Sequence, residues 1–174
     1  MPDLRYPIGP FTPDPNPTPE TRARHIEEIA ALPAKLRAAV RGLNPQQLDT
    51  TYRDGGWTVK QVAHHVPDSH MNAYVRFKLA LTENVPTIKP YEEAAWARLK
   101  DSEVTSVEVS LNLLEALHIR WVNLLRAMKP EDFNRKLNHP ESGVQTLDRA
   151  LSLYSWHGNH HVGHITALRE RMKW

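Results

Sequence analysis

Apolar residues recur at steps of three and four along four long segments of the chain, residues 18–44, 58–81, 105–125 and 147–172. This spacing places the apolar side chains on one face of an α-helix, whereas no segment shows the sustained alternation typical of a strand. Four amphipathic helices bury their apolar faces most simply against one another. The pattern therefore predicts an all-α protein, a four-helix bundle, in which the loop of residues 129–143 contains at most a minor hairpin.

Residues suited to helix N-termini mark where the predicted helices begin. An N-cap side chain accepts a hydrogen bond from the backbone two or three residues further on, and proline fits the first helical position. The predicted caps and their partners are Thr18 with Pro19, Thr58 with Gln61, Thr105 with Glu108, and Thr146, while Asn44, Pro45 and Gln47 start a short helical turn. Two prolines lie inside the predicted helices, where the missing N–H predicts a kink at Pro33 and a kink or break at Pro67.

The chain divides into a short arm and one helical body. Half of the 14 prolines lie in residues 1–19, which are expected to form an extended, irregular arm against the body of the domain or of a partner subunit. Residues 20–174 suffice for one helical bundle, so 1–174 is predicted to be a single domain. The connections after the first two long helices span about a dozen residues or more. A simple up-and-down bundle with tight turns therefore does not follow from the pattern.

Charge and composition remove several classes of function. The net charge is +2, from 22 basic and 20 acidic side chains spread along the chain, which indicates no nucleic-acid or membrane surface. The sequence has neither a signal-peptide pattern nor an apolar run of about 18 residues, so we expect a cytoplasmic protein. The chain contains no Cys, which excludes disulfides, cysteine nucleophiles and thiolate-bound metal. Histidine and carboxylate side chains must therefore carry any metal or acid–base chemistry.

Four of the ten histidines lie within eight positions of the fourth segment, in the stretch WHGNHHVGH. Residues four apart share one face of a helix, close enough for two imidazoles to reach one metal ion. His157 with His161 and His160 with His164 both have this spacing. The first pair coincides with the apolar stripe of the helix and the second lies at its edge, so periodicity leaves the choice open. The simpler interpretation is that these histidines are partly buried and satisfied by hydrogen bonds.

A further metal ligand is available in the stretch AHHVPDSH of the second segment, which offers His64, His65, Asp68 and His70. His65 and Asp68 are three residues apart on one helix face, so one can bind a metal while the other orients it or accepts a proton. For His64 and His70, a role in the core or at the surface is the simpler expectation. For Asp68, the simpler expectation is an ordinary carboxylate exposed to solvent.

Other catalytic patterns are weaker or absent. Glu115 and His118 show the Glu-x-x-His spacing of di-iron bundles, but those proteins use it twice and add two further glutamates. Its single occurrence indicates a role at the edge of the core or behind a metal ligand. The sequence has no His-Glu-x-x-His, no Gly-x-Ser-x-Gly and no phosphate-binding glycine loop.

Long blocks of the sequence resemble the YfiT branch of the DinB/YfiT family of metal-binding four-helix bundles: YPIG, YRDGGWTVKQVAHHVPDSHMNAYVRFKLALTE, PYEEAAWARLKDS and WHGNHHVGHITALRERMKW. The resemblance covers nearly the whole chain. In the family pattern the first metal ligand follows the Trp-Thr-Val helix start and directly precedes an aliphatic residue, which implies His65. The other two ligands are four apart in the last helix, and the resemblance implies His160 and His164. Pro67 departs from the pattern, since a helix-compatible residue is expected there.

The resemblance also implies an activity. Members of this branch are named as metal-dependent hydrolases, and some relatives resemble bacillithiol or mycothiol S-transferases. We therefore expect a metal-dependent enzyme with one divalent ion per chain, zinc or nickel, held by three imidazoles with an open coordination position. Such an ion can activate water for hydrolysis or a low-molecular-weight thiol such as bacillithiol for transfer.

Several alternatives and partners accompany this expectation. The main alternative is a non-catalytic metal-binding bundle, in which the ion only holds helices together. The expected partners are a small-molecule substrate and a second copy of the chain in a homodimer. The sequence does not single out a general base.

Overall fold

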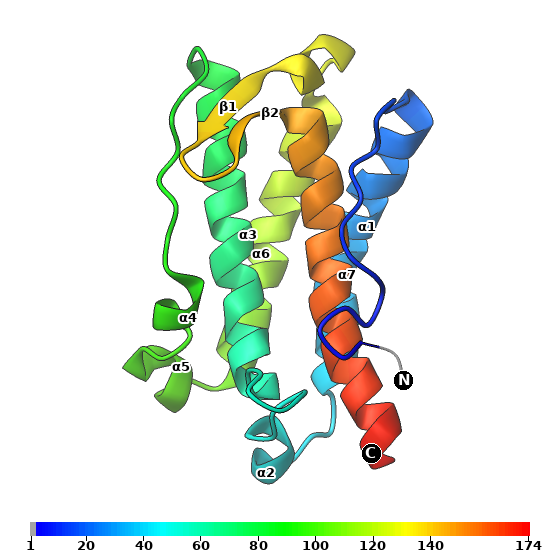
Figure 1. Ribbon diagram of the computed structural model, residues 1–174, viewed down its shortest axis with the longest axis vertical. Helices are drawn as coiled ribbons and strands as arrows, with labels where there is room; N and C mark the ends of the chain where they lie inside the picture. The colour runs from blue at the N-terminus through cyan, green and yellow to red at the C-terminus, as the bar shows by residue number, and fades with distance from the viewer. Residues whose placement is uncertain (1–2) are drawn as a thin grey trace.

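Four long helices run side by side in the computed structural model, which describes residues 3–174 (Figure 1). They are α1 (Pro19–Val40), α3 (Val59–Thr82), α6 (Val107–Ala127) and α7 (Leu147–Met172). The shorter elements are α2 (Pro45–Leu48), α4 (Glu93–Trp96), α5 (Lys100–Val104), the 3-10 helix η1 (Pro130–Asn134), and the strands β1 (Lys136–His139) and β2 (Gly143–Thr146). The predicted four-helix bundle is confirmed. Within the connection between α6 and α7, β1 and β2 pair to form an antiparallel hairpin.

Most of the predicted helix starts are confirmed. The side chains of Thr18, Thr58 and Thr146 accept hydrogen bonds from backbone N–H groups three residues further on, at the starts of α1, α3 and α7. The predicted cap at Thr105 is wrong, because Ser106 caps α6 and its hydroxyl accepts from the Glu108 N–H at 3.3 Å. A kink or break was predicted at Pro67, and a break is wrong, since α3 continues through this residue to Thr82.

The helices are not arranged in simple sequence order. α1 packs against α6 and α7, and α3 also packs against α6 and α7, so α1 and α3 lie on a diagonal of the bundle. The chain must cross an end of the bundle between them, which explains the long connection that contains α2. The close approach of α1 and α7 depends on Gly158, because a Cβ there would lie 2.4 Å from Leu32 Cδ2.

The core consists of two apolar clusters with a level of buried histidines between them. One cluster is built around Ile29, Phe77 and Trp121 at the end of the bundle near the hairpin. The other is built around Leu36 and Leu114 at the opposite end. Most of the histidines on α3, α6 and α7 lie between the residues of the two clusters. His70, His118, His160, His161 and His164 are buried there and His157 is half-buried, while the buried His65 lies beside Val66 of the second cluster. Burying so many polar rings is costly unless they have partners, so this level is where a function is expected.

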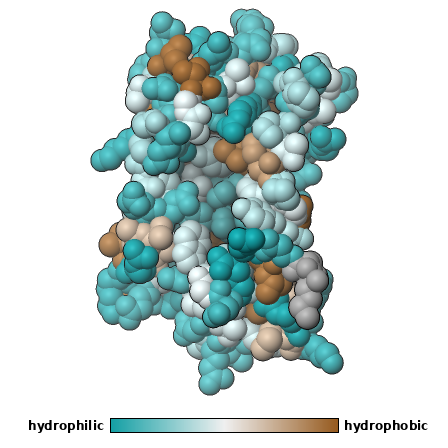
Figure 2. All heavy atoms as spheres, in the orientation of Figure 1, coloured by the Kyte–Doolittle hydropathy of each residue, from teal (hydrophilic) through white to brown (hydrophobic). Residues whose placement is uncertain are grey.

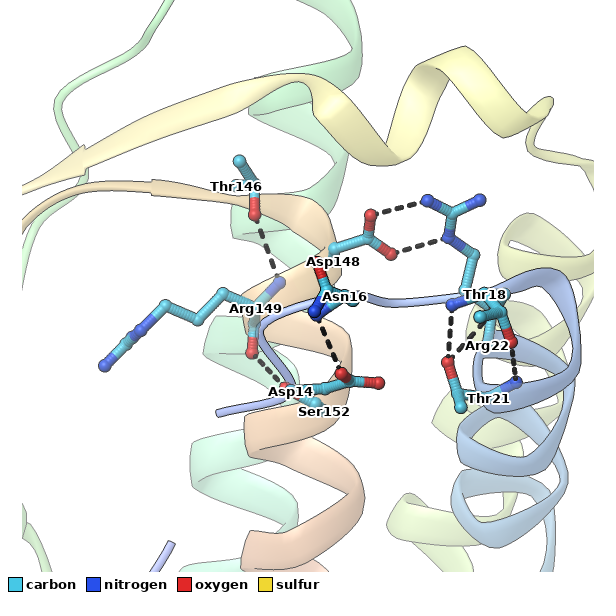
Figure 3. A network of polar contacts seen from close by, with 9 residues as sticks. All are labelled: Asp14, Asn16, Thr18, Thr21, Arg22, Thr146, Asp148, Arg149 and Ser152. Carbon is cyan, nitrogen blue, oxygen red and sulfur yellow. Dashed lines mark hydrogen bonds and ion pairs between the residues drawn. The ribbon is translucent and has the colours of Figure 1, made fainter. Parts of the chain in front are cut away.

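Two further contacts hold the first part of the chain to α7. Arg22 of α1 makes two hydrogen bonds of 2.7 Å to the Asp148 carboxylate at the start of α7, as Figure 3 shows. The proline-rich arm runs along α7 (Figure 1), and the Trp156 indole donates to the Gly9 carbonyl at 3.1 Å. In the part of the chain that is described, no helix combines the length and the apolar character needed to span a bilayer.

Candidate metal centre

Three histidines from two helices converge at mid-height of the bundle. His65 comes from α3, and His157 and His161 come from successive turns of α7. Each offers one ring nitrogen, and these nitrogens all lie within 4.8 Å of one another. His65 Nε2 and His157 Nε2 are 3.3 Å apart. Two nitrogens bound to one tetrahedral zinc are also separated by roughly 3.3 Å, given Zn–N bonds of about 2.05 Å. The same distance suits an N–H···N hydrogen bond without a metal.

The three imidazoles have the protonation that a metal ligand needs. Burial lowers the pKa of His65 to about 4. Burial, and then the neighbouring His65 and His160, hold the pKa of His157 well below its usual value. Burial, and then His157 and His65, do the same for His161. Neutral imidazoles keep a lone pair for coordination, so this donor set fits a zinc-like or nickel-like ion.

A chain of hydrogen-bonded imidazoles continues from His157 across the bundle. His157 Nδ1 lies 3.3 Å from His70 Nε2, and His70 Nδ1 lies 3.0 Å from His118 Nε2. The chain ends where His118 Nδ1 lies 2.7 Å from the backbone carbonyl of Ile29. It therefore links α7, α3, α6 and α1 at one level.

The last contact of this chain determines where every proton lies. A carbonyl can only accept, so His118 Nδ1 carries hydrogen and the Nε2 atom of this neutral ring accepts from His70 Nδ1–H. His70 Nε2 then accepts from His157 Nδ1–H. The remaining nitrogen of His157, Nε2, keeps its lone pair and faces His65. A partner behind a ligating histidine fixes its tautomer and ring orientation, which is what this chain does for His157.

Pro33 explains why the Ile29 carbonyl is available to the chain. In an α-helix this carbonyl would accept from the backbone N–H of residue 33, which proline lacks. Left without its helical donor and buried, the carbonyl accepts from His118 instead. Pro33, where the sequence predicts a kink in α1, thus frees the carbonyl group at which the hydrogen-bonded path from His157 ends.

A cavity of about 460 Å³ opens beside the three histidines. Figure 2 shows this face of the molecule hollowed at mid-height. Its lining combines the histidines with Trp57, which packs on His65 at 4.6 Å between ring centroids, and with cationic and aromatic side chains; these are Arg5, Tyr6, Tyr52, Arg53, Glu93 and Trp156. A small molecule can therefore reach the centre.

The predicted ligands His160 and His164 line the same cavity but lie on a neighbouring face of α7. His160 stacks on Trp156 at 4.4 Å, and His164 stacks on Tyr52 at 3.9 Å and donates from Nε2 to the Arg5 carbonyl at 3.1 Å. Three residues along a helix correspond to about 60° of rotation toward the neighbouring face. Of the two pairs left open by periodicity, the described structure places His157 and His161, and not His160 and His164, within ligand distance of His65.

A family model described as the DinB superfamily matches residues 28–165. The chain belongs to the DinB superfamily. A protein of Bacillus mycoides (strain KBAB4), named "Putative metal-dependent hydrolase", is 57% identical over 174 residues, which cover 100% of both chains. A Bacillus anthracis (strain A0248) protein of the same name is 56% identical with the same coverage. The family expected from the sequence is thereby confirmed.

Two solved structures agree with the fold. YfiT from Bacillus subtilis, described as a probable metal-dependent hydrolase with an unusual four-helix bundle topology, superimposes with a TM-score of 0.96 at 50% identity, covering 98% of each chain. The four-helix bundle protein TT2238 gives a TM-score of 0.61 at 20% identity over 84% of this chain and 99% of that one. The second comparison supports the fold alone.

The other residues that the sequence offered as metal ligands or catalytic groups in this DinB superfamily protein have contacts outside the three-histidine cluster. His64 is buried in the core, where its Nδ1 lies 2.7 Å from the Ser110 hydroxyl, in keeping with the structural role expected for it. Burial and then Asp101 raise the pKa of Asp68 to about 6, and within residues 3–174 no hydrogen bond joins its carboxylate to a histidine. Glu115 lies 3.4 Å from Arg37 at the surface, and both ring nitrogens of the buried His118 have other partners, His70 and the Ile29 carbonyl, so this pair is not poised as a di-iron site.

Glu93 is a functional candidate that the sequence did not reveal. It starts α4, a short helix in the loop beside α3 (Figure 1), and lines the metal cavity together with His65 and His157. Burial raises the pKa of its carboxyl group, while the nearby Arg76 acts in the opposite direction. A carboxylate in a loop with no spacing to the histidines carries no sequence signal, and only the path of the loop brings it to the cavity.

Proposed function

We propose that this protein is a metal-dependent enzyme, a hydrolase or thiol S-transferase, in which His65, His157 and His161 hold one divalent ion. The observation that carries the proposal is the convergence of three neutral imidazoles, the buried His65 and His161 and the half-buried His157, on an accessible cavity. The names of close full-length relatives support the same class of activity. Zinc and nickel both suit this donor set.

An ion held by three imidazoles supplies a Lewis acid with an open position, at which water or a thiol becomes acidic near neutral pH. The chain's own residues do the rest. His70 and His118 hold the His157 ring with Nε2 directed into the site. Glu93 lines the same cavity, which supports a role for its carboxylate in accepting a proton from the nucleophile and returning it to the leaving group. Trp57 packs against His65 and restricts the orientation of its ring.

The ligand set is tested by metal content. Untagged protein is analysed by mass spectrometry together with His65→Ala, His157→Ala and His161→Ala, and with His160→Ala and His164→Ala as matched controls on the neighbouring face. We expect about one ion per chain in wild type and in the two controls, and loss of the ion in the other three. Loss in His160→Ala and His164→Ala, with retention in His157→Ala and His161→Ala, would establish the other register.

The choice between hydrolysis and thiol transfer is tested with an electrophile such as chlorobimane, with and without a low-molecular-weight thiol. A chain with no Cys must take its thiol from the substrate, which suits transfer. We expect consumption of chlorobimane to require the added thiol and the bound metal. Consumption that ignores the thiol would reject the transferase activity and leave hydrolysis.

A purely structural ion is the competing function. It requires a fourth protein ligand and a closed coordination shell, whereas the described histidines border a cavity of about 460 Å³. Spectroscopy of cobalt-substituted protein separates the two cases. We expect an exchangeable water or thiol ligand, and its absence would favour the structural role.

A further inference from the structure

A second cavity, of about 300 Å³, adjoins the metal cavity on the hairpin side of the bundle. The two cavities share His157 and Glu93 as lining residues. The walls of the second come from α3, α7 and the β1–β2 hairpin, which lies across these helices (Figure 1). We call it the arginine chamber after two of its residues, Arg76 of α3 and Arg149 of α7.

Neither arginine of the chamber forms an ion pair within residues 3–174, although Arg76 is near enough to Glu93 to oppose the rise in the pKa of that carboxyl group. Arg76 Nη1 donates to the Tyr154 hydroxyl at 2.9 Å, and Arg149 Nη1 donates to Gln145 Oε1 at 2.5 Å. The Arg149 group also lies over the Phe11 ring at 5.7 Å, which leaves the N–H groups in its plane free. A guanidinium has five N–H donors, so most of those in the chamber are available to a ligand.

The ion pair between Arg22 and Asp148, next to Arg149 in the sequence, shows that a nearby carboxylate pairs with a different arginine. Asp148 directly precedes Arg149, but its carboxylate is taken by both ends of the Arg22 fork at 2.7 Å. Figure 3 shows the Arg149 side chain extending away from this pair. The carboxylate that could neutralise Arg149 is thus committed elsewhere, and two half-buried cations face a concave surface.

The other polar groups of the chamber are mostly donors as well. His139 Nδ1 accepts from the Glu141 backbone N–H at 3.3 Å, so the neutral ring carries its hydrogen on Nε2. Burial, followed by the charge of Arg76, lowers the pKa of His139 and favours this neutral form. Tyr154 accepts from Arg76, which leaves its own hydroxyl hydrogen to donate. Glu93 is the one carboxylate among the lining residues described.

We propose that the arginine chamber binds an anionic group of the substrate, a carboxylate or a phosphate, while the reacting group of the same molecule lies at the metal centre. Forked guanidinium donors match the two oxygens of a carboxylate or phosphate and bind them more strongly than neutral donors do. His157 separates the two cavities, so a short molecule can reach both. The inference rests on the proposed function for the reacting end of the substrate, and on the chamber alone for the anionic end.

The binding test uses four probes with zinc-loaded and metal-free protein, measured by titration calorimetry. Succinate and inorganic phosphate carry only the anion, 2-mercaptoethanol carries only the thiol, and mercaptosuccinate carries both. We expect succinate or phosphate to bind the metal-free protein, the preferred anion identifying the chemistry. We also expect mercaptosuccinate to bind the zinc form at least tenfold more tightly than 2-mercaptoethanol does.

Variants assign the effect to the chamber. Arg76→Gln and Arg149→Gln keep a side chain that can donate to Tyr154 or Gln145 but remove the charge. Each is expected to weaken anion and mercaptosuccinate binding about tenfold, the loss of one charge-assisted contact, and to leave 2-mercaptoethanol unchanged. Arg120→Gln, an exposed arginine of α6, is the matched control and should change nothing. In wild type, shifts of the Arg76 and Arg149 Nε resonances on adding succinate give a readout that needs no variant.

The outcomes separate the two proposals. Anion binding that depends on both arginines, in a protein that takes up no zinc, would uphold the chamber and reject the metal-dependent activity. Zinc and thiol binding with no response of either arginine to any anion would reject the chamber and uphold the metal centre. Equal losses in Arg120→Gln would show only a general effect of net charge and would also overturn the inference.

Discussion

Replacing His118 by Phe tests whether the imidazole chain prepares His157 for a metal ion. The change keeps a buried aromatic ring but removes the donor to the Ile29 carbonyl and the acceptor for His70. His70 can then carry its hydrogen on Nε2 and donate to His157 Nδ1. The proton of His157 would move to Nε2, the atom that faces His65 and that the proposal assigns to the metal.

The size of the effect follows from the contact that sets the direction of the chain. Reversing all three tautomers would leave the Ile29 carbonyl, 2.7 Å from His118 Nδ1, facing a lone pair instead of an N–H. Leaving a buried acceptor without its donor costs about 1–3 kcal/mol. In wild type this contact favours the Nδ1–H tautomer of His157 by that amount. Loss of the partner behind a ligating histidine usually lowers metal affinity about 10- to 100-fold, which is the fall in zinc affinity that we expect.

Zinc affinity is measured by competition with a chromophoric chelator, and the tautomer of His157 by nitrogen NMR of the metal-free, histidine-labelled protein. His118→Gln is the matched variant, because its amide can donate to the Ile29 carbonyl while its oxygen accepts from His70. It should retain most of the affinity and the Nδ1–H tautomer. His25→Phe removes a 3.0 Å contact between α1 and Ser155 of α7 without touching the chain, and controls for loss of packing. Wild-type affinity in His118→Phe, with His157 still protonated on Nδ1, would refute the reasoning.

Further predictions concern stability and assembly. Burial lowers the pKa of His118 to about 4, below the usual value of 6.5, so the unfolded chain binds more protons between these pH values. Stability should fall as pH drops from 6.5 toward 4, by about 3 kcal/mol from this residue, and urea unfolding at pH 7.5 and 5 should show a smaller fall in His118→Gln. Asp148→Asn leaves the half-buried Arg22 unpaired and should cost about 3 kcal/mol in the same assay; a cost below about 0.5 kcal/mol would show that the pair is solvent-screened. Gly158→Ala places a Cβ 2.4 Å from Leu32 and should destabilise by about 1–3 kcal/mol, unless α1 and α7 can separate freely. The homodimer stays a prediction, which light scattering at micromolar concentration checks.

Much of the fold could be read from the order of residues alone. Helix capping is local, since Thr18, Thr58 and Thr146 need only the backbone three residues further on, and apolar periodicity reports which face of each helix is buried. The cap at Thr105 was wrong by one residue because Ser106 offers an equivalent hydroxyl, and local chemistry does not separate the two. Pro67 did not break α3, because packing on two neighbouring helices outweighs one missing hydrogen bond.

The sequence determined the candidate metal site less completely than the fold. The sequence by itself restricted the chemistry to histidine and carboxylate and placed His65 on one helix and two candidate pairs on another. Spacing along a helix is identical for both pairs, and the family resemblance favoured His160 and His164, whereas the structure brings His157 and His161 within ligand distance of His65. Only the tertiary structure decided which pair faces His65, because the rotation of α7 about its axis is set jointly by α1, α3 and the proline-rich arm. The imidazole chain from His157 to Ile29 and the carboxylate of Glu93 likewise join residues far apart in sequence. Such contacts depend on where four helices cross, a property of their packing that no local pattern records.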